Sequence, residues 1–229
     1  RANEGGNHYF ISALKAEDTE GWIPLGVQAE SVMIYNPVNG ESGKAAVRQA
    51  DGRTEVYLQL ASGESLLLKT FAGSDIQASA WNYWHPASEG KKVPDRWGFR
   101  FVESTPVVTA VHDSVELDSW TELSANEVEN TMGTACYSLK EAAVLWSVPY
   151  RCLIGRYLHP GENILEVEVT NLPANRIADM DRRQIPWRIF KDANIVSLQY
   201  KKSGYENWQP VPSGLLGPVK LIPMKEVRF

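Results

Sequence analysis

Short stretches in which apolar and polar residues alternate recur along this chain. The clearest is residues 163–170, where Leu165, Val167 and Val169 are separated by polar side chains. Successive side chains leave a strand on opposite sides, so this pattern predicts one face toward a core and one toward water. A chain composed of such stretches, with almost no helical period, is constrained to a β-structure.

Further strands are expected on both sides of a polar and aromatic interruption at residues 73–95. Before it, the predicted strands are residues 22–27, 32–36, 44–49, 54–60 and 66–71. After it they are residues 107–111, 115–120, 134–139, 163–170, 195–200 and 219–222. Turns such as Asn39-Gly40 and Asp51-Gly52 tolerate the positive φ that tight hairpins require. The fold class is therefore all-β: an antiparallel β-sandwich or jelly roll at 96–229, preceded by a smaller antiparallel unit at 1–72.

Composition excludes several classes of partner. The chain has 229 residues and a net charge of -5, and nucleic-acid binding needs a clustered basic surface that is not found here. No apolar run approaches the roughly 18 residues of a membrane span, and no signal peptide opens the sequence. Because the first residue is Arg1, we expect the chain to have been cut from a longer polypeptide.

The two cysteines, Cys136 and Cys152, leave the redox compartment open. They are either buried free thiols or a disulfide that closes a modest loop. No Cys-x-x-Cys spacing occurs, which excludes a zinc ribbon and a thioredoxin-type site.

Segments spread over most of the chain carry motifs of moderate specificity. They are residues 1–14, 97–101, 117–121, 133–137, 145–151, 160–171 and 212–219. Together they resemble the C-terminal, non-catalytic region of family 106 glycoside hydrolases, the α-L-rhamnosidases, and more loosely the sugar-binding domain of family 2 enzymes. The resemblance implies a galactose-binding-like sandwich at 96–229. It also implies no catalytic residue in this chain, because those families carry their catalytic acids on a preceding (β/α)8 barrel.

The same resemblance implies partners and a location. The partner would be the catalytic barrel of the same polypeptide, and a rhamnose-containing oligosaccharide is a candidate ligand. The parent enzyme would be periplasmic or secreted. Those families also place a strand and a turn where Lys140 and Glu141 adjoin, so we hypothesise that residues are absent between these two positions.

Aromatic residues are the first candidate binding group. Trp81, Tyr83, Trp84 and His85 cluster in an expected loop, and Trp187 and Trp208 lie in similarly irregular, polar surroundings. Sugar rings present C–H faces that stack on aromatic rings, and binding residues are concentrated in loops. The alternative is that these rings fill the core or a seam between domains. Trp97, Trp120 and Trp146 lie in strand-like stretches and are expected in the core.

Polar residues after the strand at 163–170 form the second candidate group. They are Asn175, Arg176, Asp179 and Asp181. The two aspartates would share one face of an extended segment, and the arginines would keep them ionised. Three interpretations remain open: a salt-bridged loop that braces the domain, a set of sugar contacts, or a catalytic carboxylate pair.

Cofactors are not expected. The four histidines lack metal-ligand spacing, and no glycine-rich phosphate loop is present. Calcium is the one alternative, with Asn171, Asn175, Asp179 and Asp181 as hard oxygen ligands, although their spacing does not match an EF-hand.

Three functions follow from these features. The first is a structural, substrate-framing accessory region of a glycoside hydrolase. The second is an independent carbohydrate-binding module, and the third, an autonomous hydrolase, lacks a convincing set of residues. Burial of Trp81, Tyr83 and Trp84 would favour the first, and an open groove lined by them the second.

Overall fold

The computed structural model describes residues 1–3, 5–14, 17–73, 75–93, 97–109, 111–115, 117–122, 126–137, 145, 147–161, 163–188 and 204–229. The strands pair antiparallel, which confirms the all-β prediction. The expected strand at 195–200, Trp146 and the join of Lys140 to Glu141 lie outside the described residues.

The chain divides into two compact units that interleave along the sequence. The first contains Arg1–Gly90, Ala143–Arg156 and Ile222–Phe229, and the second contains Lys91–Ala142 and Tyr157–Leu221. The second unit therefore consists of two segments of the chain, separated by Ala143–Arg156 of the first unit.

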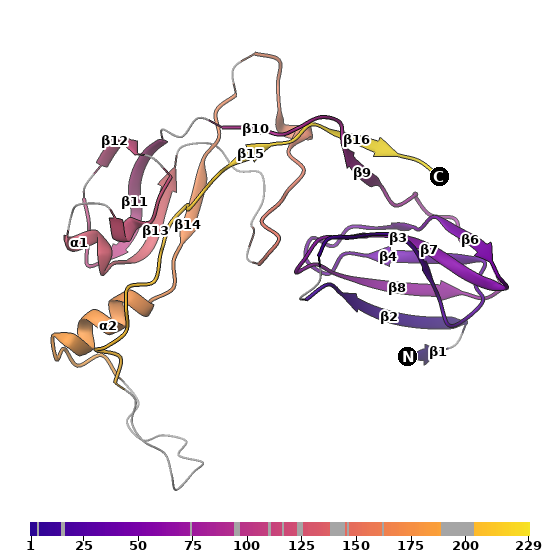
Figure 1. Cartoon of the computed structure of the whole chain (residues 1–229), viewed down its shortest axis with the longest axis horizontal. Coiled ribbons are helices and arrows are strands. Elements are labelled where there is room, and N and C mark those ends of the chain that lie inside the picture. The colour runs from indigo at the N-terminus through magenta and orange to yellow at the C-terminus, as the bar shows by residue number, and fades with distance from the viewer. Residues whose placement is uncertain are drawn as a thin grey trace, which may run out of the picture. The chain divides into compact units, whose positions relative to one another are not determined.

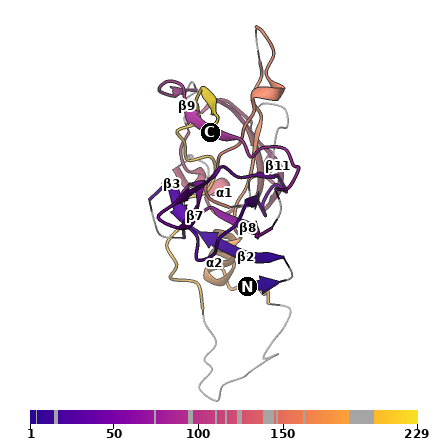
Figure 2. The same ribbon diagram turned by 90° about the vertical axis from the view of Figure 1, so that its right-hand side faces the viewer.

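The first unit is a β-sandwich (Figures 1 and 2). One sheet has the order β1 (Ala2–Asn3), β2 (Gly6–Ser12), β8 (Ser65–Phe71), β4 (Ser31–Tyr35) and β5 (Ser42–Lys44). The other has the order β3 (Thr19–Pro24), β7 (Arg53–Leu60) and β6 (Val47–Ala50). A separate pair joins β9 (Tyr83–Pro86) to β16 (Met224–Val227).

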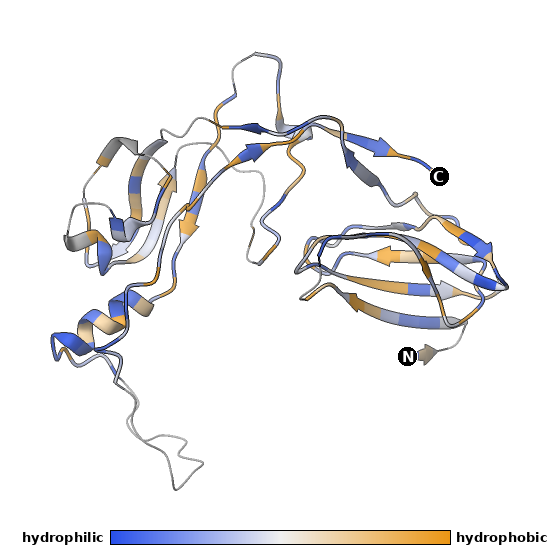
Figure 3. Cartoon of the chain, in the orientation of Figure 1, coloured by the Kyte–Doolittle hydropathy of each residue, from blue (hydrophilic) through white to orange (hydrophobic). Residues whose placement is uncertain are grey.

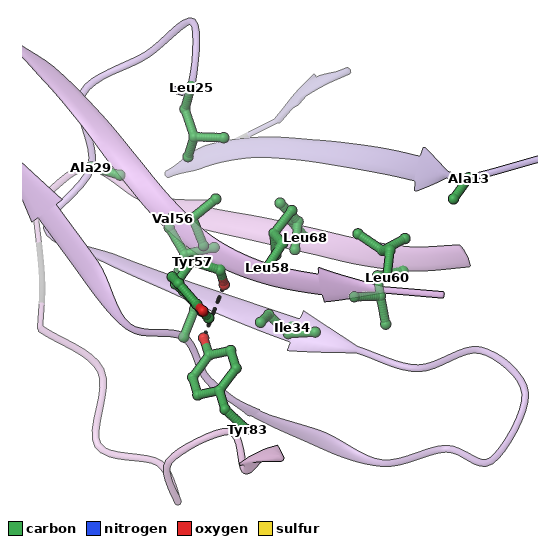
Figure 4. Close-up of a cluster of buried hydrophobic side chains, with 13 residues drawn as sticks. Ala13, Leu25, Ala29, Ile34, Val56, Tyr57, Leu58, Leu60, Leu68 and Tyr83 are labelled. Carbon is green, nitrogen blue, oxygen red and sulfur yellow. Dashed lines mark hydrogen bonds between the residues drawn. The ribbon is translucent and has the colours of Figure 1, made fainter. Parts of the chain in front are cut away.

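The core of the first unit follows from the period-two pattern of its strands. Val56, Leu58 and Leu60 alternate along β7 and form one buried cluster with Leu66 and Leu68 of β8 (Figure 4). Hydrophobic residues are interspersed with hydrophilic ones along these strands (Figure 3). Burying each such side chain contributes about 1.5–3 kcal/mol, so this cluster defines which face of each strand points inward.

The second unit is built on a four-stranded antiparallel sheet. Its order is β12 (Val111–Val115), β11 (Trp97–Thr105), β13 (Met132–Tyr137) and β14 (Val167–Thr170). A short pair joins β10 (Lys91–Lys92) to β15 (Lys220–Leu221). Among the described residues, the short helices are η1 (Trp120–Glu122), α1 (Asn126–Glu129), η2 (Gly155–Tyr157) and α2 (Ala174–Arg182).

The core of the second unit is aromatic. Phe99, Trp120 and Tyr137 are almost fully buried, and the Trp120 indole N–H donates to the Tyr137 hydroxyl at 2.6 Å. Trp97 is also buried, so the core positions expected for Trp97 and Trp120 are confirmed. The strand expected at 115–120 is wrong: the observed strand β12 ends at Val115, residues 117–119 are not in a strand, and Trp120 begins the 3-10 helix η1.

The alternation before and within β14 is confirmed. Leu165, Val167 and Val169 pack against the aromatic core, whereas Glu166 and Glu168 are exposed. The strand itself begins only at Val167. The inward residues thus follow the period of a strand even where the backbone is not paired.

Two further observations concern membrane-spanning helices and the cysteines. In the part of the chain that the structure describes, no helix is long and apolar enough to cross a membrane. Cys136 is buried in β13 and Cys152 is exposed, and both are free thiols.

Candidate functional site

The candidate residues Trp81, Tyr83, Trp84 and His85 belong to the first unit, and all of them except Trp81 lie in a strand instead of the expected loop. Residues 83–86 are strand β9, paired with β16 from Tyr83 opposite Val227 to Pro86 opposite Met224. The loop expectation is wrong because the partner strand lies about 140 residues further along the chain, where local sequence gives no sign of it. Tyr83, Trp84 and His85 are therefore part of a sheet, whereas Trp81 precedes it.

Tyr83 is a structural residue. Its side chain is buried, and its hydroxyl donates to the Tyr57 carbonyl at 3.0 Å and accepts from the Ala46 N–H at 3.0 Å (Figure 4). Burial raises the pKa of Tyr83 to about 12. The phenol therefore stays protonated and keeps both hydrogen bonds.

Trp81 and Trp84 are partly buried. Trp81 packs against the core of the first unit, and its backbone passes so close to Gly43 that a Cβ there would lie 2.7 Å from the Trp81 Cα. The backbone of Trp84 is held on both sides by the Gln59 amide, at 3.0 Å each. Neither tryptophan is presented as a freely exposed ring.

His85 contacts a carboxylate that the sequence did not single out. The Glu20 Oε1 atom accepts from the Tyr57 hydroxyl at 2.5 Å and from the Gln59 amide at 2.9 Å, and it also contacts the His85 ring nitrogen Nε2. Glu20 and Gln59 are direct neighbours across β3 and β7. This cluster, the Glu20 network, ties β3, β7 and β9 together.

The hydrogen bonds of the Glu20 network alter the acidity of its members. Burial acts to raise the pKa of Glu20, but the hydrogen bonds from Tyr57, His85 and Gln59 outweigh burial and hold that pKa below its ordinary value. Burial and the neighbouring carboxylate raise the pKa of Tyr57 to about 12. The ionised acid and the protonated phenol are therefore the stable pair.

We expect the Glu20 network to make the first unit sensitive to acid. Because the pKa of Glu20 is lower in the folded chain than in the unfolded one, its contribution to stability is complete above about pH 4.5 and is lost as the pH falls through the lower, folded pKa. In urea unfolding between pH 6 and pH 3, the stability difference between the native chain and Glu20→Gln should shrink as pH falls. A difference that is constant with pH would contradict this role.

The C-terminal aromatic residue completes a ring cluster beside this network. The Phe229 ring lies 4.2 Å from Tyr57, 5.2 Å from Tyr83 and 5.6 Å from Trp22, measured between centroids. The Arg48 guanidinium stands 4.5 Å above the Trp22 ring. Phe229 is thus packed on rings from three strands, although its side chain is 61% exposed.

The second candidate group lies on helix α2 of the second unit, and not on an extended segment. Pro173 precedes the helix, where its fixed φ is favourable, and Ala174, Ile177 and Ala178 repeat at helical spacing. Arg182 in the last turn complements the helix dipole. Residues two positions apart on a helix point about 200° apart, so Asp179 and Asp181 do not share a face.

Asp179 is the buried centre of an ion-pair cluster. Its Oδ2 accepts from the Arg176 guanidinium at 3.0 Å and from the Arg183 guanidinium at 3.3 Å. The side chains of Asp179 and Arg176 are 10% and 15% exposed, whereas Arg183 is 62% exposed. The arrangement corresponds to the salt-bridged interpretation of these residues.

Asp181 and Asn175 bind the segment of residues 205–211, which passes beside helix α2. Asp181 accepts from the Trp187 indole N–H at 2.6 Å and from the Tyr205 backbone N–H at 2.9 Å. The Asn175 amide donates to the Val211 carbonyl at 2.8 Å and accepts from the Val211 N–H at 2.7 Å. Helix α2 therefore fixes both ends of residues 205–211, which run beside it in Figure 1.

Residues 205–211 are here called the returning segment. Two of its side chains, Tyr205 and Trp208, form an aromatic row with Trp187. Trp187 lies 6.1 Å from Tyr205, and Tyr205 lies 4.6 Å from Trp208. The Arg188 guanidinium stands 4.9 Å from the Trp187 ring and 5.5 Å from the Tyr205 ring. The predicted residue Trp187 thus sits at the inner end of the row, and Trp208, which is 48% exposed, forms the outer end.

The candidate calcium ligands are engaged by protein groups. Asn171 bonds the Gly133 N–H and the Thr131 carbonyl, at 2.9 Å each, and the oxygens of Asn175, Asp179 and Asp181 hold the partners described above. Within the described ranges, no three His, Cys, Asp or Glu side chains gather as a metal-binding group.

Some of the residues that matter here were missed by sequence reasoning. Arg182 and Tyr205 on the second unit, and Glu20, Tyr57 and Gln59 on the first, were not candidates. The helical spacing of Ala174, Ile177 and Ala178 was a signal that α2 exists. The Glu20 network depends on strand register, for which the local sequence offers no signal.

Comparisons with known proteins support the fold. No protein-family model and no curated protein matches the chain. The structure is similar to part of the rhamnosidase from Novosphingobium sp. PP1Y, with a TM-score of 0.67 and 18% sequence identity over 98% of this chain. The chain spans 23% of the length of that rhamnosidase chain. At this level of identity, the likeness establishes the fold.

Proposed function

We propose that this chain is a non-catalytic accessory region of a glycoside hydrolase similar to the family 106 α-L-rhamnosidases, with its second unit a galactose-binding-like sandwich. Its role is to support the catalytic barrel of the same polypeptide and to frame the substrate. The observation that carries the proposal is the alignment of nearly the whole chain with 23% of a rhamnosidase chain. The parent enzyme would act outside the cytoplasm, in the periplasm or after secretion.

The contacts of the candidate residues support a scaffolding role. Tyr83, Asn175, Asp179 and Asp181 use their polar atoms to join segments of their own unit. The oxygens of Asp179 and Asp181 accept hydrogen bonds from arginine, tryptophan and backbone donors of the same unit, which is consistent with a role in holding that unit together.

The test is to detect the chain in the cells that produce it with an antibody raised against the 229 residues. We expect a polypeptide several times longer, and we expect removal of that polypeptide to remove hydrolysis of 4-nitrophenyl α-L-rhamnopyranoside. Pre-immune serum provides the control. The proposal fails if the chain occurs only as a short polypeptide, or if rhamnosidase activity stays in the depleted extract.

A second candidate function is carbohydrate binding by the chain itself. The observation that favours it is the half-exposed Trp208 ring at the end of an aromatic row, among polar side chains. Trp81, Trp84 and His85 stay candidates for a weaker site on the first unit, and Asn175, Arg176, Asp179, Asp181 and Trp187 support the returning segment. A rhamnose-containing oligosaccharide is the ligand to try first.

A further inference from the structure

A depression in the second unit lies between the ends of α1 and α2 and the returning segment. Its volume is about 490 Å3, and the residues that line it include Glu129, Asn130, Arg182, Glu206 and Trp208. This volume is within the range of about 300–1,000 Å3 found for small-molecule sites. The depression therefore has room for a small ligand.

The segment that carries Trp208 is fixed in place. Asp181 holds its start at Tyr205, and Asn175 holds its end at Val211. Between them the Arg182 guanidinium donates to the Trp208 carbonyl at 3.3 Å and to the Asn130 side-chain oxygen at 3.0 Å. A segment already ordered before binding loses little entropy when a ligand arrives.

Trp208 is half exposed, and its ring packs against another aromatic ring. It is 48% exposed, and the Tyr205 ring lies 4.6 Å away at an interplanar angle of 58°. Tyr205 is in turn packed beside Trp187 and Arg188. An exposed ring with a rigid support is a stacking platform for an apolar ligand face.

We propose that this depression binds a neutral saccharide, with the C–H face of a pyranose ring against Trp208. Its hydroxyls hydrogen-bond to the carboxylates, the amides and Arg182. This proposal rests on carbohydrate binding, the second function proposed above, and it assigns that function a place. The lining complements a sugar because it pairs one aromatic face with polar groups, whereas sites for drug-like ligands are mostly apolar.

The charges at the rim select against acidic sugars. Two carboxylates, Glu129 and Glu206, accompany one guanidinium, Arg182. Placing a like charge beside a carboxylate is unfavourable, more so where water is partly excluded. A galacturonate should therefore bind more weakly than the neutral galactoside of the same stereochemistry.

The test is calorimetric titration of the complete chain with the methyl glycosides of L-rhamnose, D-galactose, D-glucose and D-galacturonic acid. We expect saturable binding of at least one neutral glycoside and weaker binding of the galacturonide. Trp208→Ala should reduce the affinity about tenfold, which corresponds to the loss of one stacking contact, whereas Trp208→Phe should retain most of it. Phe10→Ala removes a 67% exposed ring from the first unit, is the matched control and should bind like the native chain, whereas Trp84→Ala tests the alternative site on the first unit.

Each contrary outcome is informative. Binding that survives Trp208→Ala and is lost in Trp84→Ala would overturn this site while leaving carbohydrate binding in place. The absence of saturable binding by all the neutral glycosides would overturn both the site and carbohydrate binding. Neither outcome bears on the accessory role, which the antibody experiment tests separately.

Discussion

Replacing Asp179 with alanine is expected to lower the free energy of unfolding of the second unit by about 3–5 kcal/mol. Asp179 is the carboxylate partner of the largely buried Arg176 guanidinium. Removing a partner from a buried ion pair leaves an uncompensated charge, and this penalty exceeds the value of the pair itself. Amide hydrogen exchange in peptides from α2 would measure the loss.

Arg183→Ala is the matched control for this prediction. Arg183 pairs with the same Asp179 oxygen, but its side chain is 62% exposed. Exposed ion pairs contribute about 0–1 kcal/mol, so its removal should hardly change protection in α2. Equal effects of the two substitutions would show that burial of Arg176 does not determine the stability of the cluster.

Replacing Trp120 with alanine is expected to be equally severe, at about 3–5 kcal/mol. Trp120 is 1% exposed, and its ring packs 5.1 Å from Phe101 and 6.1 Å from Phe99. The substitution leaves a cavity and removes the donor to the Tyr137 hydroxyl. Amide hydrogen exchange in β11 and β13 should accelerate by the factor that corresponds to this loss in the free energy of unfolding.

Trp208→Ala removes the same atoms from an exposed position and is the control for size. We expect it to cost about 1 kcal/mol or less, because it loses chiefly the contact with Tyr205. If Trp120→Ala were as mild, the aromatic cluster would not be the core of the second unit.

Strands with a strong period-two pattern could be predicted from the sequence. The predicted strand 54–60 is observed as Arg53–Leu60, and the predicted strand 66–71 as Ser65–Phe71. Alternation specifies such strands because each inward residue gains from burial, which is a local property of the sequence. The turn that precedes the first of these strands could be predicted for another reason, because Asp51 and Gly52 tolerate the positive φ that both adopt.

Features that depend on distant partners could not be predicted. Tyr83 was assigned to a loop because nothing near it indicates that Val227 is its strand partner. The role of Asp181 depends on Tyr205, which lies 24 residues further along the chain and donates its backbone N–H to the Asp181 carboxylate. Helix α2 was missed for a different reason: most of its residues are polar, and the helical spacing of Ala174, Ile177 and Ala178 extends over little more than one turn.

The pairing of β9 with β16 determines the order in which parts of the chain can fold during translation. The two strands of this pair are separated by the whole of the second unit, and the Phe229 ring packs on Tyr57 and Tyr83 from the first half of the chain. The sandwich of the first unit can therefore form early, but its last strand pair must wait until translation reaches the end of this sequence. During that interval Tyr83 lacks its strand partner, and we expect the nascent first unit to depend on chaperones or on rapid synthesis of the remainder.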